Sequence, residues 1–217
     1  MERVNGRVME FTKELLRKML DAALAKIEAN FDYLNELDSA TGDGDHGTAI
    51  LSSMKAAVQA AQADAPLAQT FSNVGWGIMN ATGGSTSSLT GSFFLGMSDA
   101  ADTESLSTDK TVALFAAGLA SVETMTTAKV GDKTLMDALI PAVGAMKKAL
   151  NADPKADLNV ILDAAASAAQ TGAESTAALM AKCGRAKNLG ERSIGHLDAG
   201  AASMALLFEA FAEATRS

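Results

Sequence analysis

The chain has 217 residues, 48% of them hydrophobic and 20% charged, which is an ordinary composition for one globular domain with a buried core. The formal net charge of −8 and the sequence pI of about 4.8 argue against a nucleic-acid binder, which usually carries a basic face. An acidic protein that handles a phosphate anion needs a cation between the two, because like charges repel.

The cysteine content and the hydropathy of the sequence both indicate where in the cell the protein is expected. The single cysteine, Cys183, excludes a disulfide framework within the chain and is typical of a free thiol in a reducing cytosol. The chain opens without the basic segment and apolar run of a signal peptide. It also lacks a run of about 18 apolar residues that would span a membrane. The sequence therefore predicts a cytoplasmic protein without membrane contact.

Helical spacing of apolar residues runs through the whole chain after residues 1–8, which are expected to form a disordered tail. The first helix is expected from Met9 to about residue 37, where apolar residues recur at steps of three and four. Seven more helices are expected, at about residues 48–62, 67–80, 89–97, 109–126, 135–150, 158–180 and 201–214. Strand signals are nearly absent and no linker interrupts the pattern. Residues 9–217 are therefore predicted to form a single all-α domain, a bundle of eight antiparallel helices.

Two polar loops, residues 38–47 and 183–197, are longer than the other breaks, and long loops in a compact helical domain often carry function. The first contains Asp38, Asp43 and Asp45, three carboxylates that repel one another unless a cation lies between them. Oxygen-only ligands indicate Mg²⁺ or Ca²⁺ rather than zinc. Glycines at 42, 44 and 47 allow a tight turn around such an ion.

Standard motifs do not explain this loop. Residues 42–47 match the letters of G-x-G-x-x-G, but they follow a helix rather than a strand. Thr48 stands where a P-loop has its lysine, and in an EF-hand register His46 and Ser52 replace the required Gly and Glu. The pattern favours a metal cluster over a solvated acidic loop that only caps a helix.

Other segments offer groups for a phosphate. Residues 83–86, Gly-Gly-Ser-Thr, precede a helix and form either a phosphate cradle or a plain N-cap. Arg185 and Arg192 are either phosphate donors or surface residues. Asp198 has the sequence context of an N-cap, and His46 either contacts a phosphate or is structural. His196 is expected to be structural, and Trp76 and the methionines are expected in the core.

Taken together, residues 34–38, 42–48, 83–86, 131–134 and 190–200 resemble, in the same order, the signature of the L domain of dihydroxyacetone kinase. The resemblance covers nearly the whole chain. It implies a barrel of eight antiparallel helices with ADP or ATP at one end, where Asp38, Asp43 and Asp45 hold two Mg²⁺ ions that bridge the phosphates. The nucleotide contacts that it implies are His46, Gly47, Thr48, Ala49, Ser85, Thr86, Leu135, Arg185, Asp198, Ala199 and Gly200.

The resemblance also implies a partner. In this family a separate K subunit or domain holds the ketose covalently through a histidine, so this chain is expected to be inactive alone. The phosphoryl donor is either ATP or a phosphohistidine M subunit of the phosphotransferase system, with ADP retained as a coenzyme. Motifs of both types are present: His46 is typical of the coenzyme type, Gly44 and Thr48 of the ATP type. A homodimer is left open.

Alternatives remain, one within the same family and others from different classes of protein. One is an ATP-using kinase subunit for a related ketose such as erythrulose. Another is a calcium-stabilised helical interaction module without catalysis, which would bind metal but no nucleotide. Enzymes acting on prenyl diphosphates usually carry two Asp-rich motifs on facing helices, whereas this sequence has one. A purely structural bundle gives no reason for three clustered carboxylates.

Overall fold

The structure is a computed structural model that describes residues 9–82 and 84–216, so the tail expected at residues 1–8 lies outside the described residues. Two short strands, β1 (Phe11–Thr12) and β2 (Ser105–Leu106), pair antiparallel. The α-helices are α1 (Lys13–Ala29), α2 (Phe31–Ser39), α3 (His46–Ala61), α4 (Leu67–Ala81), α5 (Ser85–Ala100), α6 (Thr108–Met125), α7 (Met136–Ala152), α8 (Leu158–Ser175) and α9 (Ala199–Ala214). Two 3-10 segments, η1 (Thr176–Ala178) and η2 (Arg185–Ser193), lie between α8 and α9.

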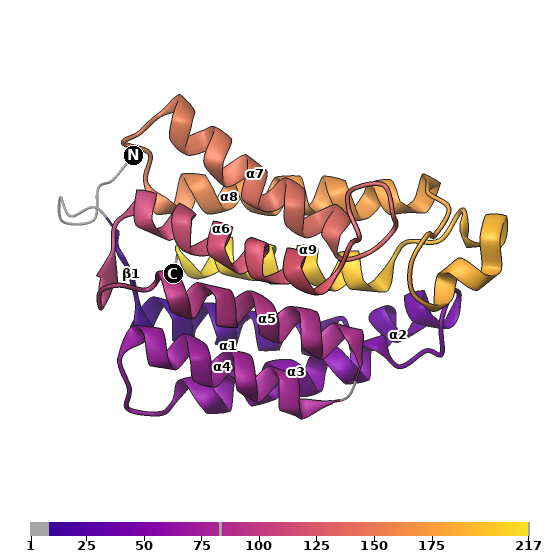
Figure 1. The fold of residues 1–217 in the computed structure, drawn as a ribbon, viewed down its shortest axis with the longest axis horizontal. Helices are drawn as coiled ribbons and strands as arrows, with labels where there is room; N and C mark the ends of the chain where they lie inside the picture. The colour runs from indigo at the N-terminus through magenta and orange to yellow at the C-terminus, as the bar shows by residue number, and fades with distance from the viewer. Residues whose placement is uncertain (1–8, 83, 217) are drawn as a thin grey trace.

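In the described part of the chain, eight helices of 15 to 18 residues form the predicted all-α barrel, and α2 is a ninth, short helix. Each long helix packs on the next along the chain, and α9 packs on α1 to close the ring (Figure 1). Because neighbours alternate in direction, α3, α5, α7 and α9 all begin at the same end of the barrel. Figure 1 shows α2 and the segment between α8 and α9 at this end, with β1 at the other.

The first long helix is not continuous, which corrects the sequence prediction for residues 9–37. Asn30 divides it into α1 and α2, with φ −111° and ψ 15° at the break. The Asn30 side-chain amide donates to the carbonyl of Lys26 at 2.8 Å, which adds a side-chain donor to the 3.2 Å bond from the Asn30 backbone N–H at this helix end. Apolar spacing continues across the break, so the periodicity gave no sign of it. The helix expected over residues 158–180 also ends earlier, at Ser175.

The core fills the barrel from side to side. Phe93, Phe115, Phe208 and Phe211 from α5, α6 and α9 form a buried cluster with neighbouring ring centroids 5.9–6.4 Å apart, most pairs edge to face or tilted. Trp76, expected in the core, is instead 56% exposed on the outer face of α4. No helix among residues 9–82 and 84–216 is long and apolar enough to cross a membrane.

Helices α7 and α8 approach closely at a glycine, and this contact gives a stability prediction. A Cβ built on Gly172 lies 2.0 Å from the carbonyl oxygen of Asp137, whereas one built on Gly144 has no neighbour within 4 Å. We expect Gly172→Ala to lower the free energy of unfolding by roughly 1–3 kcal/mol through overpacking. Gly144→Ala, on the exposed side of α7, should raise it by roughly 0.5–1 kcal/mol through helix propensity. Urea unfolding of both variants tests this, and equal effects would contradict the packing account.

Candidate functional site

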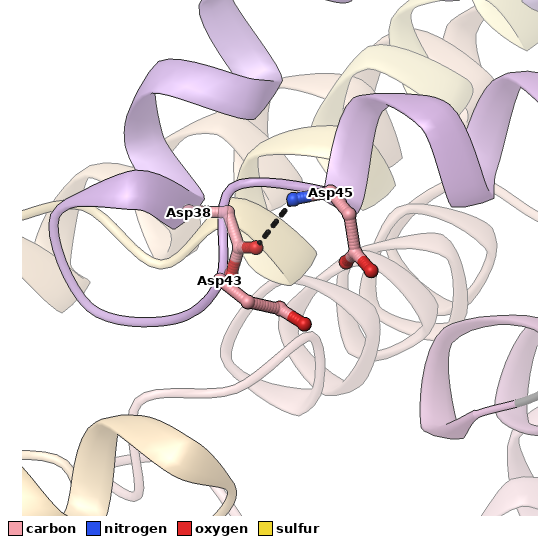
Figure 2. Close-up of side chains that lie close together, drawn as sticks. All are labelled: Asp38, Asp43 and Asp45. Atoms are coloured by element: carbon pink, nitrogen blue, oxygen red, sulfur yellow. Dashed lines mark hydrogen bonds between the residues drawn. The ribbon is translucent and has the colours of Figure 1, made fainter.

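The loop between α2 and α3 is organised by Asp38 (Figure 2). One carboxylate oxygen of Asp38 accepts hydrogen bonds from the backbone N–H groups of Gly44 at 2.8 Å and Asp45 at 3.0 Å. Gly44 has φ +80°, a conformation that favours glycine. A Cβ on Gly42 would lie 2.3 Å from the other Asp38 oxygen, so a side chain there would displace it. The two glycines therefore let the loop close around this carboxylate while its second oxygen stays clear of a side chain.

Asp38, Asp43 and Asp45 each offer an oxygen within 4.8 Å of the others, as the sequence predicted for a metal cluster. Figure 2 shows Asp38 at the end of α2 and Asp43 and Asp45 on the loop that follows, with the three side chains close together. Carboxylate oxygens at this spacing fit Mg²⁺ or Ca²⁺, which are bound through oxygen. Arg185 forms an ion pair with Asp43 and so offsets part of the negative charge. The donor set and the cradle at Gly42 are thus suited to a divalent cation.

Beside the aspartates lies a cavity of about 450 Å³, within the usual size range of small-molecule sites. Every nucleotide contact implied by the resemblance lines this cavity except Gly47. Gly47 is instead buried at the contact between α3 and α2. The two helices approach so closely there that a Cβ on Gly47 would lie 2.4 Å from the carbonyl oxygen of Phe31. Arg192 is not part of the lining. The lining also includes residues that the sequence did not single out for this site: Thr126, Ala128, Lys133, Met136 and Cys183.

Three helices, α3, α5 and α9, begin at this cavity with free backbone donors. Among described residues, no acceptor bonds the N–H groups of the first two residues of each helix: His46, Gly47, Ser85, Thr86, Ala199 and Gly200. Such groups, together with the positive end of the helix dipole, bind anions such as phosphate. The Thr48 N–H differs, because it donates to the Asn35 side chain at 3.3 Å. The cavity thus has cation ligands on one side and anion donors on the others.

His46 lines the cavity, and its ring is largely buried. Its Nε2 lies 2.9 Å from the Ser203 hydroxyl of α9, and its Nδ1 lies 3.3 Å from the Thr86 hydroxyl of α5. Burial lowers the pKa of His46 to about 4 against the opposing effect of Asp38, so the ring is neutral at physiological pH. Ser203 was not identified from the sequence, because nothing in its local context marks it.

Buried polar groups stabilise the part of the cavity wall that lies between the starts of α7 and α9. Lys133 has φ +62°, is 2% exposed, and donates to the carbonyls of Thr176, at 2.6 Å, and His196. Burial lowers the pKa of the Lys133 ammonium. Asp137 accepts from the N–H groups of Gly131 and Thr134 and so fixes the turn before α7. These contacts join three segments that are distant in sequence, so the signature at residues 131–134 marked the position of Lys133 but not its partners.

Asp198 caps α9, as its sequence context predicted, and Cys183 is a half-buried free thiol, also as predicted. The Asp198 carboxylate accepts from the N–H of Ala201 at 2.7 Å. Burial raises the pKa of Asp198 to about 6, and the hydrogen bond from Ala201 opposes the shift.

Comparison with known proteins agrees with this geometry. Residues 40–213 match the DAK2 domain. The chain belongs to the DAK2 domain family. It is 34% identical to the ADP-binding subunit DhaL of PEP-dependent dihydroxyacetone kinase 1 from Listeria innocua, over 93% of this chain and 96% of that protein. It is 33% identical to the corresponding Escherichia coli subunit, over 85% of this chain and 89% of that protein.

A solved structure supports the same relationship. The dihydroxyacetone kinase from C. freundii, in complex with AMP-PNP and Mg²⁺, superposes with a TM-score of 0.67 at 27% identity. The match covers 98% of this chain and 36% of the longer C. freundii chain. The helical fold is therefore that of a DAK2 domain, and the chain is of about the same length as the L. innocua and E. coli subunits.

The buried carboxyl of Asp198 gives a pH prediction for metal-free protein. Because its pKa is raised from 3.8 to about 6 on folding, this group favours the folded state below about pH 4 and loses that contribution as pH rises through 6. Asp198→Asn can still cap α9 but does not titrate. We expect the free energy of unfolding of Asp198→Asn to rise relative to wild type by on the order of 2–3 kcal/mol between pH 4 and 7. Urea unfolding at several pH values measures this, and a constant difference would contradict it.

Proposed function

We propose that this chain is the nucleotide-binding subunit of a dihydroxyacetone-type kinase, a phosphotransferase that holds ADP or ATP with two Mg²⁺ ions. The phosphoryl group passes to a ketose held on a separate K subunit. The observation that carries the proposal is the placement of three aspartates and three helix N-termini around one cavity. The near full-length similarity to DhaL subunits supports the same assignment.

The roles of the residues follow from their chemistry. Asp38, Asp43 and Asp45 hold the Mg²⁺ ions, which supply charge neutralisation at the phosphates. The free N–H groups at the starts of α3, α5 and α9 donate to phosphate oxygens. Leu135, which lines the cavity at the start of α7, lies against the base. Phosphoryl transfer depends mainly on positioning and charge, which is what these groups provide.

Arg185 has a second role in this proposal. In the structure its guanidinium pairs with Asp43, and both side chains are largely exposed. With Mg²⁺ held by the aspartates, the Arg185 guanidinium would be free to donate to a phosphate oxygen, for which its planar donors are suited.

The donor is proposed to be a phosphohistidine M subunit of the phosphotransferase system, with ADP kept as a coenzyme. Relatives matched over most of their own length are described as PEP-dependent or, in Lactococcus lactis, PTS-dependent ADP-binding subunits. An ATP-using subunit for erythrulose is the second candidate, since the chain is 32% identical to part of the L-erythrulose 1-kinase of Mycolicibacterium smegmatis. That match covers 32% of the kinase.

The remaining expectations are consistent with this role. The free thiol of Cys183 suits the cytoplasm, where a phosphotransferase-system partner acts. A calcium module without nucleotide is less well supported, because it leaves the free helix N-termini and the cavity without a ligand.

The ligand prediction is tested by thermal unfolding of metal-stripped protein with ADP, with Mg²⁺, and with both. At a hundred times its dissociation constant a ligand adds about 2.7 kcal/mol, a rise in Tm of roughly 5–10 °C for a domain of this size. We expect that rise only with both, because the carboxylates and the phosphates repel each other without the metal. Asp43→Asn should abolish it, whereas Asp64→Asn, fully exposed at the far end of α3, should not. A full rise with metal alone would favour the calcium module.

The partner prediction concerns activity. Mixed with a K subunit and dihydroxyacetone, the ADP-loaded chain should phosphorylate the ketose when a phosphohistidine M subunit and its upstream donors are supplied. The chain without the K subunit should be inactive, because in the proposed division of labour the ketose is held by the K subunit. Formation of the ketose phosphate is the measurement. Turnover with ATP alone would favour the second candidate, and activity without the K subunit would contradict the division of labour.

A further inference from the structure

Three helix N-termini are joined behind the cavity by one chain of hydrogen bonds. The ring of His46, at the start of α3, bridges the hydroxyl of Thr86 on α5 and the hydroxyl of Ser203 on α9. Ser203 also donates to the carbonyl of Gly200 at 3.0 Å. His46 and Thr86 line the cavity, whereas Ser203 lies behind it and is 4% exposed.

The number of hydrogens in this chain of hydrogen bonds determines which groups donate and which accept. A serine hydroxyl carries one hydrogen, and that of Ser203 is directed to Gly200, so Ser203 must accept from His46 Nε2–H. A neutral imidazole has one N–H, so Nδ1 must then accept from the Thr86 hydroxyl. In this arrangement the Thr86 hydrogen is used inside the protein and is not available to a ligand.

A phosphate at the start of α5 favours the opposite arrangement. When the Thr86 hydroxyl donates to a phosphate oxygen, it keeps its hydrogen bond to His46 by accepting from Nδ1–H, which leaves Nε2 as an acceptor. The Ser203 hydroxyl then turns from Gly200 to donate to Nε2. Both arrangements hold one ring proton and two hydroxyl hydrogens, so the charge is unchanged and the ring proton moves between nitrogens by exchange with solvent. The bond to an anion is the stronger one.

We propose that Ser203 is a positioning residue: its hydroxyl lets His46 exchange tautomer when a nucleotide phosphate binds, and so turns the Thr86 hydroxyl toward that phosphate. The role needs a group that can both donate and accept, which a hydroxyl does and a methyl does not. This inference rests on the proposed function. Ser203 thus contributes to nucleotide binding although it does not line the cavity.

The tautomer of His46 can be observed directly. In ¹⁵N-labelled protein, long-range ¹H–¹⁵N spectra distinguish Nε2–H from Nδ1–H, and His196→Gln assigns the signals of the two histidines. We expect the Nε2–H form in the free protein and the Nδ1–H form with ADP and Mg²⁺. The same ring form in both states overturns the proposal.

Substitution of Ser203 provides the second readout. Ser203→Ala should leave His46 in one tautomer and raise the Kd for ADP with Mg²⁺ roughly tenfold, the value of about one hydrogen bond. Ser203→Thr keeps the hydroxyl and should restore both the exchange and the affinity to within about twofold. Ser92→Ala removes another buried hydroxyl, paired with Ser121 at 2.9 Å between α5 and α6, and should leave the Kd unchanged.

The outcomes separate this inference from the proposed function. If wild type binds no ADP with Mg²⁺, the proposed function and the coupling are both overturned. If wild type binds but the ring form does not change, or if Ser203→Ala binds as wild type does, the coupling alone is overturned. If Ser203→Ala does not fold, the wild-type spectra still decide.

Discussion

The site depends on one geometric constraint, the alternation of helix direction around a closed ring. Because eight long helices alternate, four of them begin at the same end, and their dipoles present positive charge there. Three of those starts keep free N–H groups at the cavity, while the fourth, α7, is closed by Asp137 and Thr134. A fold with this alternation therefore provides anion donors at one end before any particular side chain is considered.

The acidic loop adds the opposite charge at the same place. After the break at Asn30, α2 lies at this end of the barrel (Figure 1), and Asp38 in its last turn holds the loop by accepting from Gly44 and Asp45. Three carboxylates beside helix N-termini would compete with a phosphate for the same donors unless cations separate them. In the proposed complex, Mg²⁺ held by the aspartates would neutralise charge between them and the phosphates, and would so allow a chain with net charge −8 to bind a polyanion.

Much of this could be predicted from sequence because it is local. Apolar spacing indicated the long helices, and clustered Asp and Gly marked the loop that carries Asp38, Asp43 and Asp45. The missed features depend on contacts between distant segments: Lys133 reaches Thr176 and His196, and Ser203 reaches His46. Asn30 was missed because a side chain closes the helix end without disturbing the apolar period. Trp76 was misplaced because a large apolar residue on a helix is usually buried, and here it is not.

The central claim is that cations join the aspartates to the phosphates of one nucleotide. It is tested most directly by measuring the Kd for ADP calorimetrically in metal-stripped protein over a series of free Mg²⁺ concentrations. Linkage requires that ADP binding strengthen Mg²⁺ binding by the same factor as the reverse. The account predicts that the apparent Kd falls steeply as Mg²⁺ rises, with uptake of about two ions per ADP. An affinity for ADP that does not depend on Mg²⁺ would contradict it.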